Sequence, residues 1–190
     1  MEEALILVLG PGSSGKTLML KRLQTVSSQM NLPPSQRQKE LGEAPPTIPT
    51  VGVNLVTVNF LRKKFTFREL GGAMAPIWSN YLKEAAFLIY IFDIANRFQI
   101  SASCILLLEV LASKETQDMP VLLVFNKIDS PGCMSIAEVA SLIRLEDIKA
   151  HAKQDLTAVE ASFRTGEGMD DVLQWIKAKA GPKKKGSFQV

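Results

Sequence analysis

Residues 10–17 read GPGSSGKT and constrain the fold of this chain more than any other segment. They match the pattern G-x-x-x-x-G-K-[S/T]. The apolar run of residues 4–9 precedes them, and residues 18–26 follow with apolar side chains at roughly helical spacing. Glycines let backbone N–H groups wrap a phosphate, and the N-terminus of a helix adds a favourable field. The sequence therefore predicts a buried strand, a phosphate-binding loop and a helix in succession.

This loop supplies the first candidate site residues. Lys16 would reach the terminal phosphates of a nucleotide, and Thr17 would offer its hydroxyl to Mg²⁺. The other candidates in the loop would bind phosphate mainly through the backbone; they are Gly10, Gly12, Ser13, Ser14 and Gly15. The loop alone does not separate a kinase, an ATPase and a switch.

The rest of the chain alternates strand-like and helix-like segments. A hairpin is predicted from residues 53–61 and 64–70, and further strands at 85–92, 121–125 and 156–161. Helices are predicted at 101–113, 135–143 and 168–180. This order predicts an α/β fold, a three-layer P-loop NTPase domain. Its sheet would be mostly parallel and six-stranded, with helices on both faces and the hairpin as an antiparallel edge pair.

Length and composition indicate one domain over residues 1–181. Residues 27–49 are polar and proline-rich, which predicts a long flexible loop, and residues 182–190 form a basic tail that we expect to be disordered. Much of the net charge of +3 lies in that tail, so charge gives no reason to expect nucleic-acid binding. Two distant cysteines and no membrane-spanning run predict a cytoplasmic protein.

A second motif indicates the base. Residues 121–129 read VLLVFNKID, a buried strand ending in Asn-Lys-x-Asp. Ligands of such sheets bind outside the carboxyl ends of the strands. Asp129 could accept two hydrogen bonds from the N1–H and N2–H₂ edge of guanine, which adenine lacks. Asn126 would contact N7 and tether neighbouring loops, and the stem of Lys127 would cover the base plane.

With both motifs present, the sequence resembles the small GTPases of the Ras superfamily. Residues 49–54, PTVGVN, and 71–78, GGAMAPIW, resemble the Arf branch, and the likeness spans residues 4–180. The resemblance implies a GTP/GDP switch in which Thr50 binds Mg²⁺ and the γ-phosphate. The Gly72 amide would bind that phosphate as well. A guanine-specificity loop would follow the last strand at Ser162, Phe163 and Arg164, although Phe163 stands where this family has a small residue.

The resemblance implies two switch segments that GTP and Mg²⁺ would order, residues 47–54 and 69–78. The second departs from the family pattern Asp-x-Gly-Gly-Gln. Glu69 replaces the aspartate, and we expect it to help hold Mg²⁺ with Thr17 and Thr50. Ala73 replaces the glutamine that orients the attacking water. An unpositioned water can cost on the order of 10²-fold in rate, so we expect slow hydrolysis and assign no certain catalytic residue. Another side chain, or a partner, remains an alternative source of that function.

The resemblance also bears on partners. It implies effector proteins that bind the switch regions, with exchange and GTPase-activating proteins as regulators. Arf proteins carry an acylated amphipathic helix before the first strand and an aromatic triad for effectors. Here the strand begins almost at Met1, which predicts no intrinsic lipid anchor, and Tyr81 alone of the triad is aromatic, beside Val53 and Arg68. We expect a monomer with its own set of effectors, in membrane or ciliary traffic by analogy.

Three functions compete. The first is a GTP-binding switch with slow hydrolysis. The second is a non-cycling, GTP-bound scaffold, motivated by Ala73. The third is a P-loop kinase or ATPase, against which the guanine motif at Asp129 argues.

Overall fold

The computed structural model describes residues 4–30, 41–60 and 63–179. The strands are β1 (Ala4–Leu9), β2 (Val53–Phe60), β3 (Lys63–Leu70), β4 (Phe87–Asp93), β5 (Val121–Asn126) and β6 (Leu156–Ala161). The α-helices are α1 (Lys16–Met30), α2 (Ser79–Leu82), α3 (Ile100–Ala112), α4 (Ile136–Ile143), α5 (Leu145–His151) and α6 (Met169–Lys179). In the described part of the chain, the 3₁₀ turns η2 (Gly72–Ile77), η3 (Arg97–Gln99) and η4 (Lys114–Thr116) join them.

The six strands form one sheet in the order β2-β3-β1-β4-β5-β6. Only β2 runs antiparallel, against β3, and all other pairs are parallel. The predicted fold, including the hairpin as an edge pair, is therefore confirmed. Because the parallel strands share one direction, the carboxyl ends of β1, β4, β5 and β6 meet at one edge of the sheet.

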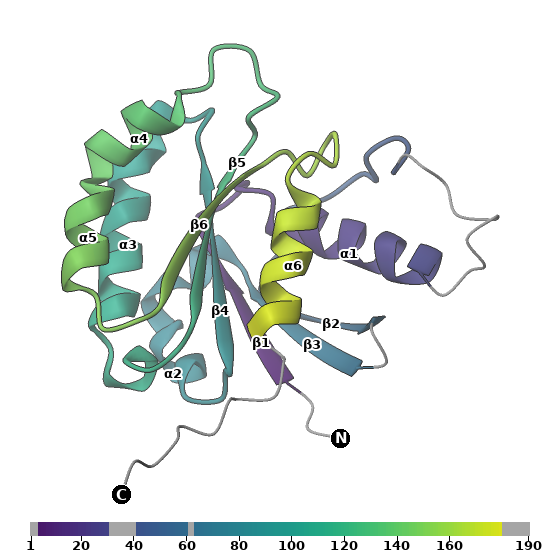
Figure 1. Cartoon of the computed structure of the whole chain (residues 1–190), viewed down its shortest axis with the longest axis horizontal. Helices are drawn as coiled ribbons and strands as arrows, with labels where there is room; N and C mark the ends of the chain where they lie inside the picture. The colour runs from purple at the N-terminus through teal and green to yellow at the C-terminus, as the bar shows by residue number, and fades with distance from the viewer. Residues whose placement is uncertain (1–3, 31–40, 61–62, 180–190) are drawn as a thin grey trace, which may run out of the picture.

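Helices cover both faces of the sheet (Figure 1). Alternate residues of β1 point to opposite sides: Ile6 and Val8 pack with α1 and α6, whereas Leu7 and Leu9 pack with α2, α3 and α4. The strands between the two helical layers are apolar on both faces, as expected for a buried parallel sheet. This double core holds the strand ends, and the loops that leave them, in fixed relative positions.

The predicted loop at residues 27–49 is partly wrong, because α1 continues to Met30. Ser27 is buried in that last turn and donates its hydroxyl to the backbone oxygen of Asn59 on β2. A tertiary contact therefore extends the helix beyond the residues whose apolar spacing predicted it. Residues 41–49 contain no helix or strand, and residues 31–40 lie outside the described part of the chain.

Two short helices, α2 and α5, were not predicted. α4 ends at Arg144, which adopts a left-handed conformation (φ 53°), and α5 begins directly after it. Leu145 is buried where the two helices meet, and this packing stabilises a helix too short to show a period. The other predicted elements differ from the observed ones by one or two residues at their ends. The predicted tail, residues 182–190, lies outside the described residues.

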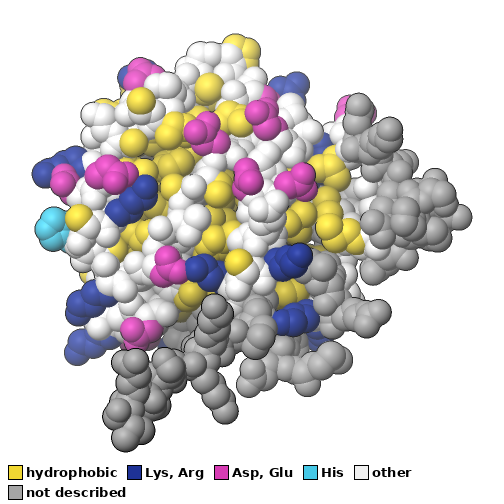
Figure 2. Space-filling view, in the orientation of Figure 1, with side chains coloured by type: hydrophobic (Ala, Val, Ile, Leu, Met, Phe, Trp, Pro, Cys, Tyr) yellow, Lys and Arg dark blue, Asp and Glu magenta, His cyan; other side chains and the backbone are white. Residues whose placement is uncertain are grey.

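The face of the molecule seen in Figure 2 carries acidic and basic side chains interspersed with apolar ones. Cys104 and Cys133 are free thiols. Within residues 4–30, 41–60 and 63–179, the structure contains no helix with the length and apolar character needed to cross a membrane.

Candidate functional site

The predicted phosphate loop joins β1 to α1. The Lys16 side chain folds back over it and donates from Nζ to the backbone oxygens of Gly10 (2.9 Å) and Pro11 (2.8 Å). Burial lowers the Lys16 pKa from 10.5 to about 8, and the nearby Glu69 carboxylate opposes that shift. Within the described residues, the Ser14 hydroxyl is buried without a hydrogen-bond partner. A buried cation beside an unsatisfied hydroxyl fits an anionic phosphate group.

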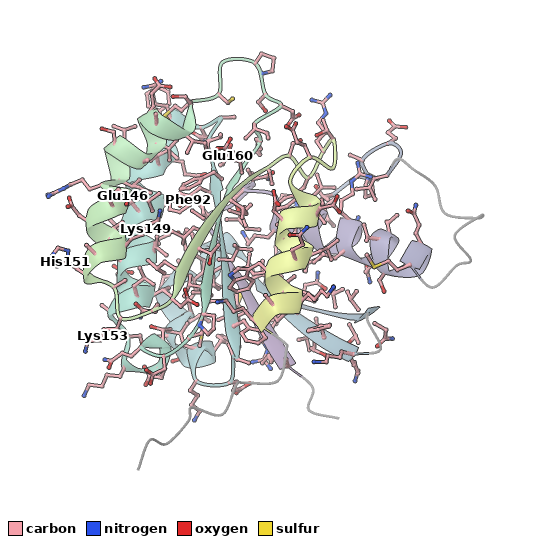
Figure 3. The ribbon with its side chains drawn as sticks, viewed as in Figure 1. Phe92, Glu146, Lys149, His151, Lys153 and Glu160 are labelled. Carbon is pink, nitrogen blue, oxygen red and sulfur yellow. The ribbon has the colours of Figure 1, made fainter. Side chains whose placement is uncertain are left out.

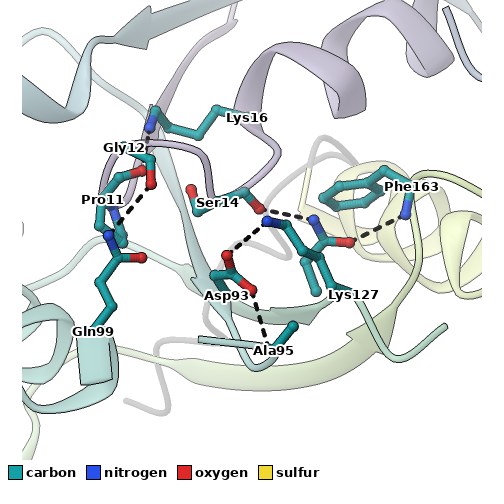
Figure 4. A network of polar contacts seen from close by, with 10 residues as sticks. Pro11, Gly12, Ser14, Lys16, Asp93, Ala95, Gln99, Lys127 and Phe163 are labelled. Carbon is teal, nitrogen blue, oxygen red and sulfur yellow. Dashed lines mark hydrogen bonds and ion pairs between the residues drawn. The ribbon is translucent and has the colours of Figure 1, made fainter. Parts of the chain in front are cut away.

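The end of β5 lies directly against this loop (Figure 4). Asn126 donates from Nδ2 to the backbone oxygen of Ser14 (2.8 Å) and accepts from the Phe163 amide at Oδ1 (3.1 Å). A Cβ at Gly15 would lie 2.2 Å from Asn126 Nδ2, so only glycine permits this approach. Asn126 thus joins the phosphate loop to the loop after β6, as the predicted tether would.

The predicted base-recognition residues lie together. The Ser162 hydroxyl donates to Asp129 Oδ1 (2.6 Å), and Arg164 lies 3.6 Å from Asp129 Oδ2. Lys127 Nζ forms an ion pair with Asp93 Oδ2 (2.6 Å). These contacts fix the carboxylate and the lysine stem at the shared edge of the sheet.

Phe163 contributes to this loop through its backbone. Its side chain is fully buried in the core with α1 and α6, and its amide holds Asn126. The unusual bulk at this position is therefore accommodated in the core, beside Gly15 of the phosphate loop. Here packing explains the departure from the small residue of the family pattern.

Arg22 belongs to none of the predicted motifs. Its guanidinium is buried (1% exposed) on α1 and donates only to backbone oxygens among the described residues. The partners lie in the loop after β6 and in the segment before Thr50: Phe163 (3.0 Å), Arg164 (2.5 Å), Leu41 (2.7 Å), Gly42 (3.1 Å) and Glu43 (3.4 Å). Carbonyl dipoles compensate the buried charge, and Arg22 joins the base loop to the segment leading to Thr50.

Asp93 was missed as well. It ends β4 opposite Asn126 of β5 and accepts from the Ala95 amide (3.0 Å) in addition to Lys127. The strand-end rule could have found it, since Asp93 follows a continuous apolar run. Its carboxylate fixes the lysine whose stem was predicted to cover the base.

Three oxygen-bearing side chains converge beside the phosphate loop. Thr17 Oγ1 lies 2.5 Å from Glu69 Oε1 and 2.9 Å from Thr50 Oγ1, and Thr50 Oγ1 lies 3.0 Å from the same carboxylate oxygen. Asn54 Nδ2 holds the other oxygen of Glu69 (3.0 Å). Hydroxyl and carboxylate oxygens are the donors that Mg²⁺ prefers. Glu69 is the one carboxylate among these converging side chains, so phosphate and water oxygens would complete the shell of such an ion.

The two predicted switch segments meet each other and the phosphate loop. The Gly71 amide donates to the backbone oxygen of Gly52 (2.9 Å). A Cβ at Gly72 would lie 2.2 Å from the Gly12 nitrogen, so a larger residue there would force the two backbones apart. Ala73 follows in η2, exposed and without a polar side chain.

The comparisons with known proteins agree with this geometry. Residues 1–180 match the sequence description "Arf: ADP-ribosylation factor family". The chain belongs to this family. It is 46% identical over 177 residues to human ADP-ribosylation factor-like protein 16, covering 93% of this chain and 86% of that protein. It is 34% identical over 176 residues to ADP-ribosylation factor-like protein 1 of Drosophila melanogaster, covering 92% and 87%.

A solved structure shares the fold. The Arl6 BBS3 small GTPase from Trypanosoma brucei, with the bound nucleotide analogue GppNp, superposes with a TM-score of 0.75 at 18% identity, covering 93% of this chain and 96% of that one. Family membership makes this chain a small GTPase, a guanine-nucleotide-binding protein of the switch type. The phosphate loop and the guanine motif are the parts of the sequence that predicted this.

One group of titratable side chains lies on and after α5, away from the predicted nucleotide site. Figure 3 shows Glu146, Lys149 and His151 on α5, with Lys153 in the segment that follows. A cavity of about 590 Å³ lies between α3 and α5, and none of its lining residues belongs to the predicted nucleotide site. His151 is exposed at this cavity.

Proposed function

We propose that this protein is a Mg²⁺-dependent GTP switch with slow intrinsic hydrolysis, which presents a GTP-ordered surface to effector proteins. One observation carries the proposal. The hydroxyls of Thr17 and Thr50 and the Glu69 carboxylate lie within 3.0 Å of one another, while Gly72 abuts Gly12. This is the arrangement in which both switch segments reach the terminal phosphate end of the site.

Each candidate residue has a role in this proposal. Lys16 and the backbone of residues 10–17 bind the phosphates, and Thr17, Thr50 and Glu69 hold Mg²⁺. The metal, when bound, neutralises charge that develops on the phosphate oxygens. The Gly72 amide binds the γ-phosphate. The base contacts come from Asn126, Lys127, Asp129, Ser162 and the backbone of Phe163 and Arg164.

Exposed apolar side chains around the switches supply the effector surface. Ile48, two positions before Thr50, is 83% exposed, and Val51, directly after Thr50, is 97% exposed. Leu55 of β2 and Ile77 of η2 are exposed as well. An apolar surface that depends on Thr50 being held against the metal site would be rearranged when the γ-phosphate is lost. That dependence would make the surface specific for the GTP-bound state.

Ala73 supports slow hydrolysis, since a methyl group cannot orient water. The same residue motivates the second candidate function, a GTP-bound scaffold that does not cycle. Both candidates need the base site and the metal site, and they differ in whether bound GTP is ever converted to GDP.

The first test is to purify the protein gently in Mg²⁺, denature it and separate the released nucleotide by chromatography. We expect guanine nucleotide in nearly one equivalent, retained in Mg²⁺ and released faster after chelation. Adenine nucleotide, or none, would overturn the proposal. GTP that stays unhydrolysed over hours in the purified protein would favour the scaffold, whereas slow conversion to GDP would favour the switch.

A further inference from the structure

We propose that Gln99 positions the attacking water in place of the side chain that Ala73 lacks. The proposal rests on the GTP-binding function proposed above and concerns the residual hydrolysis of that nucleotide. Gln99 lies 26 positions beyond Ala73 in the sequence, where η3 ends and α3 begins. No sequence motif singles it out, and its relation to the phosphate loop exists only in the folded chain.

The Gln99 side chain reaches the tip of the phosphate loop. Its Nε2 donates to the backbone oxygen of Gly12 at 3.4 Å (Figure 4). Gly12 is also the residue whose nitrogen a Cβ at Gly72 would overlap, at 2.2 Å. The Gln99 amide and the start of η2 therefore both lie against Gly12 of the phosphate loop. Ala73 directly follows Gly72, on the side of the loop where the γ-phosphate is expected.

The amide of Gln99 has unused hydrogen-bonding capacity. Its Oε1 is buried and has no hydrogen-bond partner among the described residues. An unsatisfied buried acceptor is costly, so it favours a ligand that donates a hydrogen bond. The contact from Nε2 to Gly12 is long, and such a bond is weak enough to rearrange when GTP binds. An acceptor for a water proton beside a donor for a phosphate oxygen is what water positioning requires.

Nearby acids are already engaged. Asp93 accepts from Lys127 and the Ala95 amide, and Glu69 accepts from Thr17, Thr50 and Asn54. Gln99 differs from them in having a free acceptor. In the step that it supports, the water oxygen forms a bond to the γ-phosphorus and the bond from that phosphorus to the β–γ bridging oxygen breaks. The electron pair stays on GDP, and the water proton passes to the released phosphate.

A purely structural role for Gln99, as a link between α3 and the phosphate loop, makes different predictions. Loss of such a link would loosen the loop and weaken GDP and GTP binding alike. Loss of a water-positioning group would leave GDP affinity unchanged and affect only states that contain the attacking water. Aluminium fluoride with GDP mimics the transferring phosphoryl group with water in line, so it reports on positioning without turnover.

The experiment compares the full-length wild-type protein with Gln99→Ala and with the control Phe98→Ala. Phe98 lies in the same turn, and 98% of its surface is exposed. Each protein is loaded with a fluorescent GTP in Mg²⁺. Single-turnover hydrolysis, GDP affinity, thermal midpoint and the aluminium fluoride response are then measured. We expect Gln99→Ala alone to slow hydrolysis roughly tenfold and to lose the aluminium fluoride response, with GDP affinity and thermal midpoint unchanged.

A double variant gives a rescue test. Ala73→Gln supplies an amide from η2, so adding it to Gln99→Ala should restore hydrolysis and the aluminium fluoride response. Equal hydrolysis in Gln99→Ala and wild type would overturn the inference, as would a matching loss of GDP affinity. A wild-type protein that binds GTP yet shows neither hydrolysis nor an aluminium fluoride response would overturn it while leaving GTP binding intact. Failure to bind GTP would overturn the proposed function and this inference with it.

Discussion

The two ends of the predicted nucleotide site differ in how completely protein contacts fill them. At the base end, Asn126, Asp129 and Ser162 are fixed by short hydrogen bonds, and buried Arg22 joins the surrounding loops. At the phosphate end, Ala73 offers nothing to a water molecule and Gln99 retains an unpartnered oxygen. A satisfied network holds the base-recognition groups in place, whereas the phosphate end keeps an acceptor that is free to bind water. We therefore expect changes at the base end to alter nucleotide affinity, and changes at the phosphate end to alter responses that depend on the γ-phosphate.

The largest effect should follow from removing the predicted guanine contacts at the base end. Asp129→Ala removes two expected hydrogen bonds to guanine, each of about 1.5–3 kcal/mol because one partner is charged, so GTP should bind roughly 10³-fold more weakly. Competition binding with a fluorescent GTP measures this loss.

Inosine triphosphate sharpens this test, because it lacks the amino group that Asp129 would bind. Wild type should prefer GTP to inosine triphosphate, and Asp129→Ala should not distinguish them. Asp118→Ala, at an exposed loop position, is the control and should behave as wild type. A preference that survives in Asp129→Ala would place base recognition elsewhere.

The second largest effect should follow from the loss of Arg22, which joins the loops around the base end. Arg22→Met keeps an unbranched apolar stem but leaves five backbone oxygens without their donor. We expect the free energy of unfolding to fall by about 3 kcal/mol in urea titrations at saturating GDP, with faster GDP release. Gln24→Met, exposed on the same helix, is the matched control. Faster release without lost stability would limit Arg22 to a local role.

The smallest of these effects should come from the phosphate end. Gly72→Ala introduces a Cβ 2.2 Å from the Gly12 nitrogen, so η2 must move away from the phosphate loop. GTP should lose one hydrogen bond to a charged oxygen, roughly tenfold in affinity, and GDP should lose nothing. Parallel titrations with GDP and a non-hydrolysable GTP analogue measure the difference. Ala73→Gly is the control, and equal losses for both nucleotides would contradict a γ-phosphate contact.

Much of the site could be predicted because its motifs are local. Residues 10–17 and 126–129 each combine a buried strand with a loop of fixed chemistry, so neither needs distant contacts to be recognised. Glu69 was assigned from the pattern of the second switch, and the structure brings it within 3.0 Å of Thr17 and Thr50. The alternation of strands and helices likewise predicted the sheet and both helical layers.

Other parts could not be predicted, because their meaning depends on distant partners. Arg22 reaches Phe163 across 141 positions and Gln99 reaches Gly12 across 87, and neither belongs to a motif. The predicted loop at 27–49 was partly wrong because Ser27 contacts Asn59 of β2. Helix α5 was not predicted, because packing of Leu145 stabilises it and its seven residues are too few to show a helical spacing of apolar side chains.

Short segments of the sequence were enough to predict the fold and the chemistry of the two nucleotide motifs, because the local spacing of glycine, lysine and carboxylate groups encodes them. The family followed from the resemblance of residues 49–54 and 71–78 to the Arf branch. Tertiary structure alone decided where the switches meet, since Gly71 and Gly72 act through the backbones of Gly52 and Gly12. It also decided that a buried arginine joins the base loops and that Gln99 lies at the phosphate end. Such pairings follow from how the sheet brings strand ends together, which no single segment of the chain specifies.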